Sequence, residues 1–440
     1  MKDARGSRDR WVLRERNVIS PIPRKYTNLV FEKASGIEIK SADGRSLIDL
    51  TGGFHVGLLG YSHPSIIEAT KEQLERLDYI PHYMGTCPIR VELAEELLSL
   101  SPRRLRKGLI AYCNTGSDAA EFAIKLARYS TGRKGLVSCL GAYHGGTMGG
   151  LSITTAGSRL RSGYAPFLPD VYFVRYPDAY RDHVDGDPQS CWVRSIDELE
   201  FLFDEVVKPE EIAALFIEPI QAHGGVLIPP SQYFKKLRQI CSKYEILLFA
   251  DEVVTGFGRT GRMFGMEHHG VEPDAMFLGK PMGGGLPLGA VVGRREIMER
   301  WTADGPASTL AASTIACARA FALLQTIVKE NLLANARRVG QHIVKRFSEM
   351  SERLEIIGDV RGKGLMIGVE LVKDRRTKAP ATKETRKILE GAYRKGVILE
   401  SSGRFGNVLK LTPPLIITEL QADRALEVMG RCMNEEARKT

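Results

Sequence analysis

The sequence predicts an α/β fold, in which a mostly parallel sheet is covered by helices and a smaller α+β domain follows at the C-terminus. The first observation is that apolar runs at 213–217 and 246–250 flank a helical segment at 232–244. Because parallel strands need a crossover of this kind, the pattern indicates a parallel sheet buried on both faces. The second observation is a change after Leu310, where a long Ala- and Leu-rich helical stretch leads into the smaller domain.

Further elements follow from local patterns along the chain. A Ser or Thr three residues ahead of a Glu or Gln predicts helices that start near Ser65, Ser195 and Thr418. Apolar runs and helix-period segments predict the rest. These are strands at 275–278, 290–292, 365–371 and 409–412, and helices at 118–129, 385–395 and 419–436. The polar segments 181–189 and 373–380 are interpreted as surface loops without a chemical role.

Composition limits the classes of function. The chain has 440 residues, 43% apolar and 26% charged, which is typical of a water-soluble globular protein and excludes disorder. Seven cysteines without a CxxC pair indicate neither a disulfide framework nor a metal site, so we expect a cytoplasmic protein without bound metal. No apolar run approaches the roughly 18 residues of a membrane span, and we expect no membrane association.

The net charge of +9 is concentrated at the N-terminus, where residues 1–25 hold eight Lys/Arg and three Asp/Glu. This tail has no aromatic interleaving beyond Trp11, and the rest of the chain shows no basic stripe. We therefore expect no nucleic-acid partner. The tail is expected to lie across the body of the protein or a neighbouring subunit.

Three candidate catalytic side chains follow successive predicted strands. Glu218, Asp251 and Lys280 each come directly after or at the end of an apolar run. Because an open parallel sheet binds its ligand at the carboxyl ends of its strands, these side chains are expected to meet in one crevice. Upstream, Gly116 and Ser117 open a helix, and the free N–H groups of a helix start bind phosphate well.

A phosphate cradle, an Asp and a Lys at strand ends suggest pyridoxal phosphate as the cofactor. A lysine amine forms a Schiff base with its aldehyde, and its ring then accepts electrons from a carbanion. Asp251 would keep the ring nitrogen protonated by opposite-charge pairing, and Lys280 would anchor the cofactor and carry the proton. Tyr143 is the candidate for stacking on the ring.

Five segments together resemble a known family: GSDAAEFAIKLAR (116–128), AYHGGTMG (142–149), IEPIQAHGG (217–225), LLFADEVVTGFGRTG (247–261) and FLGKPMGGGLPLGA (277–290). They are similar to the class III aminotransferases, the pyridoxal phosphate enzymes that include 4-aminobutyrate, ornithine and acetylornithine aminotransferases. The resemblance covers about residues 30–429. It implies fold type I, with a sheet of the seven-stranded type and a C-terminal α+β domain.

The resemblance also implies site residues and an assembly. The cofactor-site residues carried over are Gly116, Ser117, Tyr143, Glu218, Asp251, Val253, Lys280 and Thr309. In the family a Thr like Thr309 reaches the phosphate of the partner subunit's cofactor, which implies a homodimer with shared active sites, or a higher oligomer. The expected domains are an N-terminal segment packing on the dimer and the small domain (1–70), a large cofactor-binding domain (71–315), and a connecting helix with the C-terminal domain (316–440).

The candidate substrate-binding residues are Phe54, His223, Arg404 and Lys410. In the 4-aminobutyrate and ornithine branches, a Glu at the position of His223 pairs with an Arg at the position of Lys410. Both are replaced here, and Lys lacks the planar fork of Arg that grips a carboxylate. Arg404 is the alternative carboxylate ligand. The usual Gly-Gly-Asn-Pro after the phosphate-binding Thr is also replaced, by residues 310–314.

The leading hypothesis is a pyridoxal phosphate aminotransferase that moves an amino group from an amino acid or ω-amino acid donor to a 2-oxo acid. The alternative is a racemase or epimerase on the same fold, with His223 at near-neutral pKa as a second acid/base opposite Lys280. A third hypothesis is a phosphate- or dinucleotide-binding module without this cofactor. The other histidines, among them His55 and His144, are interpreted as structural.

Overall fold

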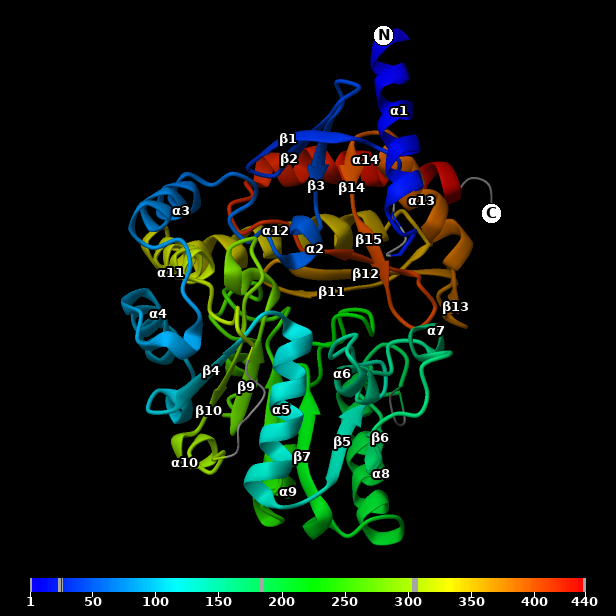
Figure 1. The fold of residues 1–440 in the computed structure, drawn as a ribbon. Helices are drawn as coiled ribbons and strands as arrows, with labels where there is room; N and C mark the ends of the chain where they lie inside the picture. The colour runs from blue at the N-terminus through cyan, green and yellow to red at the C-terminus, as the bar shows by residue number, and fades with distance from the viewer. Residues whose placement is uncertain (1, 23–24, 26, 183–185, 303–307, 438–440) are drawn as a thin grey trace.

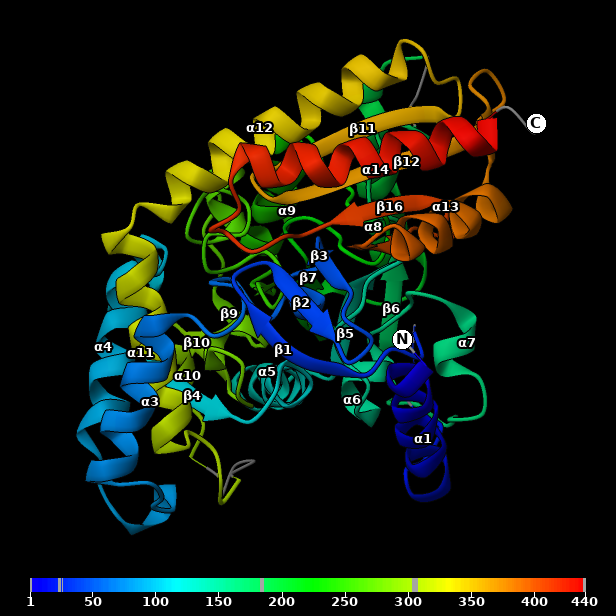
Figure 2. The same cartoon turned by 90° about the horizontal axis from the view of Figure 1, so that it is seen from above.

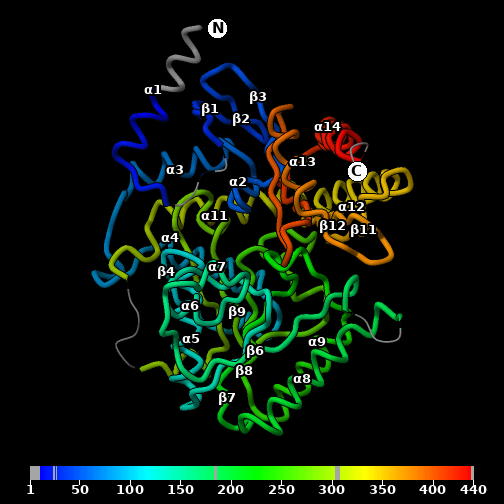
Figure 3. The backbone as a smooth tube through the Cα atoms, turned by 90° about the vertical axis from the view of Figure 1, so that its right-hand side faces the viewer, coloured from blue at the N-terminus to red at the C-terminus, as the bar shows by residue number. Residues whose placement is uncertain are grey.

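The computed structural model describes residues 2–22, 25, 27–182, 186–302 and 308–437. The chain forms a lower α/β body built around one large sheet, and an upper body in which strands from both ends of the sequence meet (Figure 1). Seen from the side, α13 (Thr382–Arg394) and α14 (Glu419–Ala437) lie in the upper body, above the large sheet (Figure 3). None of the described helices is both long and apolar enough to cross a membrane.

The large sheet has seven strands in the order β4-β10-β9-β8-β7-β5-β6. Strand β10 runs antiparallel to both of its neighbours, whereas β6, β5, β7, β8 and β9 are parallel. The short link from β9 to β10 holds no crossover helix, so these two strands can only pair as a hairpin. The mostly parallel seven-stranded sheet is confirmed. Its strands are β4 (Leu109–Cys113), β5 (Gly135–Cys139), β6 (Val171–Val174), β7 (Ile212–Ile217), β8 (Leu247–Asp251), β9 (Ala275–Leu278) and β10 (Gly289–Gly293).

Helices bury both faces of this sheet. Phe216, Phe249 and Phe277, one from each of three neighbouring strands, share a buried cluster with α5 (Gly116–Thr131). The residues that alternate with them, such as Leu215 and Leu248, belong to a second cluster that includes α8 (Cys191–Glu205) and α9 (Ser231–Lys243). Because successive side chains of a strand point to opposite faces, continuous apolar strands require this double cover.

One of the three helix starts predicted from capping patterns is wrong. Helix α3 (Pro64–Arg76) begins at Pro64, next to the predicted Ser65, because proline is favoured in the first turn. Helix α8 begins at Cys191 instead, with Ser195 buried inside it. Tertiary burial outweighs the local pattern there. At α14 the capping pattern is confirmed, since Thr418 and Gln421 exchange hydrogen bonds of 3.0 and 3.2 Å.

The C-terminal part begins with α11 (Thr314–Lys329) and α12 (Leu332–Ser351), which divide the predicted helical stretch at the left-handed residue Asn331. A sheet in the order β11-β12-β16-β15 follows, with β13 at the edge of β12. Helices α12 and α14 lie across β11 and β12 (Figure 2). Residues 373–380 are not simply a loop, because they include the end of β12 and β13. The strands are β11 (Ile357–Lys363), β12 (Met366–Asp374), β13 (Ala379–Pro380), β14 (Val397–Ile398), β15 (Glu400–Ser402) and β16 (Val408–Leu411).

The N-terminal part joins the upper body. Strands β1 (Phe31–Ser35), β2 (Glu38–Ser41) and β3 (Ser46–Asp49) form a sheet that β14 completes. The basic N-terminal segment forms the helix α1 (Lys2–Val18), which projects from the body (Figure 1). Helices α3 and α4 (Pro88–Leu100) pack against α11.

A close backbone contact joins the two bodies. Arg259 is fully buried and donates to the carbonyl oxygens of Leu365 and Pro413, while the Leu365 N–H returns a bond of 2.9 Å to the Arg259 carbonyl. Beside it, Gly364, in the turn between β11 and β12, packs on the backbone of the lower body, since a Cβ at Gly364 would lie 2.3 Å from the Thr260 carbonyl carbon. Gly364 also touches Gly340 of α12, and a Cβ at Gly340 would overlap the Gly364 carbonyl. The two bodies therefore meet where no side chain fits.

We predict that Gly340→Ala destabilises the fold by about 1–3 kcal/mol or more, because the new methyl group meets backbone that cannot move aside. Gly430→Ala is the matched control. Gly430 also lies inside a helix, but its added Cβ would contact only the Met350 side chain at 3.6 Å. It should stabilise by about 0.5–1 kcal/mol through helix propensity. Thermal and denaturant unfolding measure the free energy of unfolding of both variants. Equal changes in Gly340→Ala and Gly430→Ala would contradict this account.

Candidate functional site

The three strand-end residues lie at one edge of the large sheet. Strands β7, β8 and β9 are neighbours, and Glu218, Asp251 and Lys280 stand at or just after their carboxyl ends. Burial lowers the pKa of Lys280, and Asp251 lies near enough that its charge partly opposes this shift. The sequence spacing thus translates into a shared crevice, as expected for a doubly covered parallel sheet.

Asp251 is fixed from two sides. One oxygen, Oδ2, lies 2.7 Å from Nδ1 of His144, and the other, Oδ1, accepts a bond of 3.0 Å from the Val253 N–H. His144 packs against Phe216 and Phe277 and is itself buried. Its second nitrogen, Nε2, has no partner among the described residues. His144 was predicted to be structural; the geometry gives it a specific task, orienting the Asp251 carboxylate.

Lys280 stands in a strained backbone position. Its φ is 44°, in the left-handed region that non-glycine residues avoid, and such strain concentrates at functional sites. Burial lowers the pKa of Lys280, an effect that the nearby Asp251 opposes. Within the described ranges its amine makes no hydrogen bond or ion pair, so the group is available to a ligand.

The start of α5 forms the other side of the crevice. Thr115 caps the helix by accepting from the Asp118 N–H at 3.1 Å, and the first N–H groups, of Gly116 and Ser117, have no partner in the described part of the chain. A Cβ at Gly279 would lie 2.7 Å from the Gly116 backbone, and a Cβ at Gly116 would lie 3.0 Å from Val253. Glycine at 116 and 279 is therefore what lets the helix start approach the lysine.

Glu218 ties two loops together. Its Oε1 accepts from the Tyr143 N–H at 3.1 Å, and its Oε2 accepts from the Ala222 N–H at 2.8 Å. Burial, together with the charge of Asp251, raises the pKa of Glu218 to about 7. The Tyr143 loop is further held by a bond of 3.2 Å from the Gly146 N–H to the Ser117 hydroxyl.

Tyr143 stacks on His223, with ring centroids 4.5 Å apart. Burial and the positive charges of Lys410 and Lys280 lower the pKa of His223 to about 3. The prediction of a near-neutral imidazole is therefore wrong, because the sequence did not show how deeply the ring is buried or that Lys410 and Lys280 lie near it. In the free protein this ring is neutral at physiological pH.

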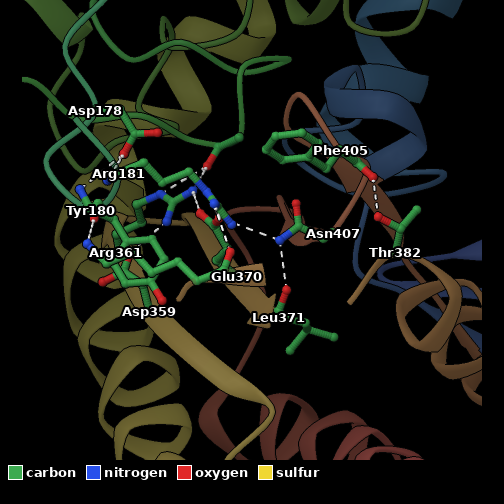
Figure 4. A network of polar contacts seen from close by, with 12 residues as sticks. Asp178, Tyr180, Arg181, Asp359, Arg361, Glu370, Leu371, Thr382, Phe405 and Asn407 are labelled. Atoms are coloured by element: carbon green, nitrogen blue, oxygen red, sulfur yellow. Dashed lines mark hydrogen bonds and ion pairs between the residues drawn. The ribbon is translucent and has the colours of Figure 1, made fainter. Parts of the chain in front are cut away.

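His223 and Arg404 line the same cavity of about 830 Å³. Arg404 is exposed, and its guanidinium lies 5.3 Å from the ring centre of Phe405. The loop that carries it is held by polar contacts to Phe405 and Asn407 (Figure 4). Thr382 donates to the Phe405 carbonyl at 2.8 Å, and the Asn407 amide donates to the Leu371 carbonyl at 2.7 Å.

The wall of this cavity contains a buried carboxylate between two arginines. Glu370 accepts from Arg181 Nε at 2.5 Å and from Arg361 Nη2 at 2.8 Å (Figure 4). Arg181 falls in a segment that was predicted to be a loop without a role, so that prediction needs correction: the side chain links the large sheet's loops to β12. A tertiary ion pair of this kind leaves no trace in the local sequence.

Phe54 lies in an unusual turn. Four consecutive residues, 52–55, have φ between 57° and 73°, and Phe54 has the value of 57°. The ring of Phe54 is 44% exposed and lines a second cavity of about 640 Å³, which Glu400 also lines. His55, from the same turn, lies with Nε2 at 3.4 Å from Glu400 Oε1.

Lys410 is buried, and its amine lies 3.3 Å from Glu400 Oε1. Sequence reasoning missed Glu400, and it interpreted His55 as structural. A charged residue at the end of the apolar run 397–399 was the available signal for Glu400. Thr309 is exposed, next to Ser308, whose hydroxyl accepts from the Asn114 amide at 2.7 Å; the role of Thr309 toward a partner subunit stays a prediction.

These residues fit pyridoxal phosphate. Free N–H groups at a helix start suit its phosphate, an oriented carboxylate suits its ring nitrogen, and an unpaired amine suits its aldehyde. No cluster of His, Cys, Asp or Glu in the described ranges is arranged to hold a metal ion.

Comparison with known proteins agrees with this fit. The family model for class III aminotransferases matches residues 21–433. An alanine/serine racemase of Pyrococcus horikoshii is 40% identical over 96% of this chain and 89% of its own length. A 5-aminovalerate aminotransferase of Pseudomonas aeruginosa is 35% identical over 93% of this chain and 94% of its own length. Among solved structures, a PLP-bound amine transaminase from an uncultivated Pseudomonas species has a TM-score of 0.86 and 32% sequence identity. The match covers 96% of this chain and 97% of that structure's chain.

The match across nearly the whole chain excludes the hypothesis of a binding module without this cofactor. Fold, site geometry and relatives all lead to one assignment. The chain belongs to the class III aminotransferase family, and its cofactor is pyridoxal 5'-phosphate.

Proposed function

We propose that Lys280 is the catalytic residue of this aminotransferase, which transfers an amino group from an amino acid or ω-amino acid donor to a 2-oxo acid. The observation that carries the proposal is the placement of Asp251 and Lys280 at adjacent strand ends, with the free N–H groups of α5 beside them. An oriented carboxylate, an unpaired amine and an anion site in one crevice match what the cofactor requires.

The protein's own groups divide the remaining tasks. When bound, pyridoxal phosphate supplies an aldehyde that takes up the amino group and a ring that draws electrons from the substrate carbon. Asp251 would hold the ring nitrogen, with His144 fixing the carboxylate, and Gly116 and Ser117 would donate to the phosphate. Tyr143 and Val253 would contact the ring, and Glu218 keeps the Tyr143 loop in place.

Lys280 is suited to carry a proton. Because burial lowers the pKa of its amine, a larger share is uncharged near neutral pH than in an exposed lysine. An uncharged amine can accept a proton from the substrate carbon and return it to another atom. Among the residues that the structure describes, the other amine close to the crevice, that of Lys410, is paired with Glu400.

Arg404 is the proposed ligand of the substrate carboxylate. It lies beside His223 on the wall of the larger cavity, and its guanidinium is exposed rather than ion-paired within the described residues. A guanidinium binds a carboxylate with two parallel hydrogen bonds. Phe54, exposed from its strained turn, would contact the substrate side chain.

We also propose a cytoplasmic homodimer with shared active sites. The support for the dimer is the exposed position of Thr309, which in related enzymes serves the partner's cofactor. The support for the cytoplasm is that all seven cysteines are buried and free of disulfides. The domain boundaries at residues 70 and 315 also remain predictions.

Racemisation or epimerisation of an α-amino acid is the second candidate function. It is favoured by the alanine/serine racemase among the relatives and by the closeness of the His223 ring to the Lys280 crevice. A second acid/base is needed on the face opposite the lysine. His223 is a weak base in the free protein, but a substrate carboxylate bound nearby would raise its pKa by opposing the positive charges around it.

We predict that Lys280→Ala lowers turnover by at least about 1,000-fold, because both the anchoring amine and the proton carrier are lost. Borohydride should fix the cofactor permanently to the native protein and not to this variant, as peptide mapping would show. Lys235→Ala, at an exposed position of α9, is the matched control and should behave as the native enzyme does. Full activity in Lys280→Ala would rule the proposal out.

The two candidate functions differ in what happens without a 2-oxo acid. If the enzyme racemises, a single amino-acid enantiomer incubated in D₂O should yield the mirror form with deuterium at the α carbon. His223→Phe, which keeps a ring against Tyr143, should slow this exchange by about 100-fold or more while leaving the amine-to-cofactor half-reaction within about tenfold. If no mirror form appears while the amino acid still changes the cofactor's spectrum fully, racemisation is excluded and transamination is the activity.

A further inference from the structure

A buried ion pair lies on the two last strands of the upper body. Glu400 of β15 and Lys410 of β16 are direct partners across the antiparallel ladder, and Lys410 Nζ lies 3.3 Å from Glu400 Oε1. Their side chains are 9% and 1% exposed. Taking two charges out of water costs more than their attraction commonly returns, so stability alone does not account for such a pair.

His55 completes the cluster from another part of the chain. Its Nε2 lies 3.4 Å from Glu400 Oε1, and its Nδ1 lies 2.8 Å from the Thr412 hydroxyl. His55 has a φ of 73° in the strained turn 52–55, which costs free energy and persists only where its surroundings enforce it. Burial and the neighbouring cations lower the pKa of His55, so it stays neutral and positions Glu400 without adding charge.

The cluster borders the catalytic crevice. The charge of Lys410 lowers the pKa of both Lys280 and His223, and the charge of Glu400 acts on Lys280 in the opposite sense. The loop that follows β15 is bonded to the His223 turn, through the Gly403 N–H and the His223 carbonyl at 2.9 Å. Glu400 also lines the cavity into which Phe54 projects.

We infer that the Glu400–Lys410 pair is a specificity determinant that excludes substrates with a second carboxylate and favours amino acids with uncharged side chains. This inference rests on the proposed function. Lys410 offers a substrate no net attraction because Glu400 already compensates it. A side-chain carboxylate that approached Lys410 would meet the negative charge of Glu400, and displacing Glu400 would leave a buried carboxylate unpaired.

The exclusion concerns only the second carboxylate. The α-carboxylate that every amino acid carries has its own candidate ligand in Arg404, which lines the other, larger cavity beside His223. The pair therefore does not block amino acids as such. It separates glutamate from glutamine, which have the same shape and differ in charge.

The first test uses the native holoenzyme. Half-reactions are followed by the change in the cofactor's visible band with glutamate, and with glutamine, methionine and alanine as uncharged donors. We expect kcat/KM for the best uncharged donor to exceed that for glutamate by about 100-fold or more, because like charges brought together in a buried site repel strongly. If glutamate reacts as well as the uncharged donors, the inference is overturned while the proposed function stands.

The second test changes the pair itself. Glu400→Gln should free Lys410 and raise the ratio of kcat/KM for glutamate to that for the uncharged donor by about tenfold or more. The matched control is the double variant Glu400→Gln with Lys410→Met, which has the same glutamine but no cation and should show no such rise. The double variant also replaces both charges together, which buried pairs tolerate better than the loss of one partner.

The outcomes separate the two proposals. An unchanged donor ratio in a folded, cofactor-loaded Glu400→Gln variant, or an equal rise in the double variant, overturns the specificity role. If the single variant does not fold, the native donor ratio from the first test decides. If neither these α-amino acids nor an ω-amino acid such as 4-aminobutyrate changes the spectrum of the native protein, the proposed function fails and the inference fails with it.

Discussion

The orientation of one buried carboxylate, Asp251, is the constraint on which the site depends. A carboxylate at a strand end can rotate, and its use as a partner for a ring nitrogen requires a fixed direction. The His144 ring and the Val253 N–H each take one of its oxygens, and the aromatic cluster around His144 keeps that ring from moving. The order β9-β8-β7 then brings Lys280 and Glu218 to either side of the same carboxylate.

The electrostatics of the crevice are a balance between burial and neighbouring charges. Burial pushes Lys280 and His223 toward their neutral forms and raises the pKa of Glu218 toward neutrality. Asp251 and Glu400 oppose the lowering of the Lys280 pKa that burial causes, whereas the cation of Lys410 adds to it, and Lys410 is itself paired with Glu400. A ligand that adds or removes charge changes the protonation of several groups at once.

The site belongs to both bodies of the molecule. Asp251, Lys280 and the start of α5 come from the large sheet, whereas Arg404, Glu400 and Lys410 come from the C-terminal strands, and Phe54 and His55 from the N-terminal part. The buried Arg259 and the close contact of Gly364 with Thr260 hold these bodies together. Packing far from the chemistry therefore sets the distance between the groups that bind the cofactor and those that select the substrate.

The sequence by itself determined four strands of the large sheet, β7, β8, β9 and β10, and the residues that follow them, because apolar runs, their spacing and strand-end residues are local properties. The local patterns did not predict β4, β5 and β6. Strand β9 lies where its pattern predicts, and Gly116, Asp251 and Lys280 stand together as their spacing requires. The tertiary structure alone decided that α8 begins at Cys191 rather than at Ser195, since burial outweighs a capping pattern. It alone decided the contacts of His144 with Asp251 and of Glu400 with Lys410 and His55. The physical reason is that such contacts join residues ten to several hundred positions apart, and only the folded chain brings their charges within reach of one another.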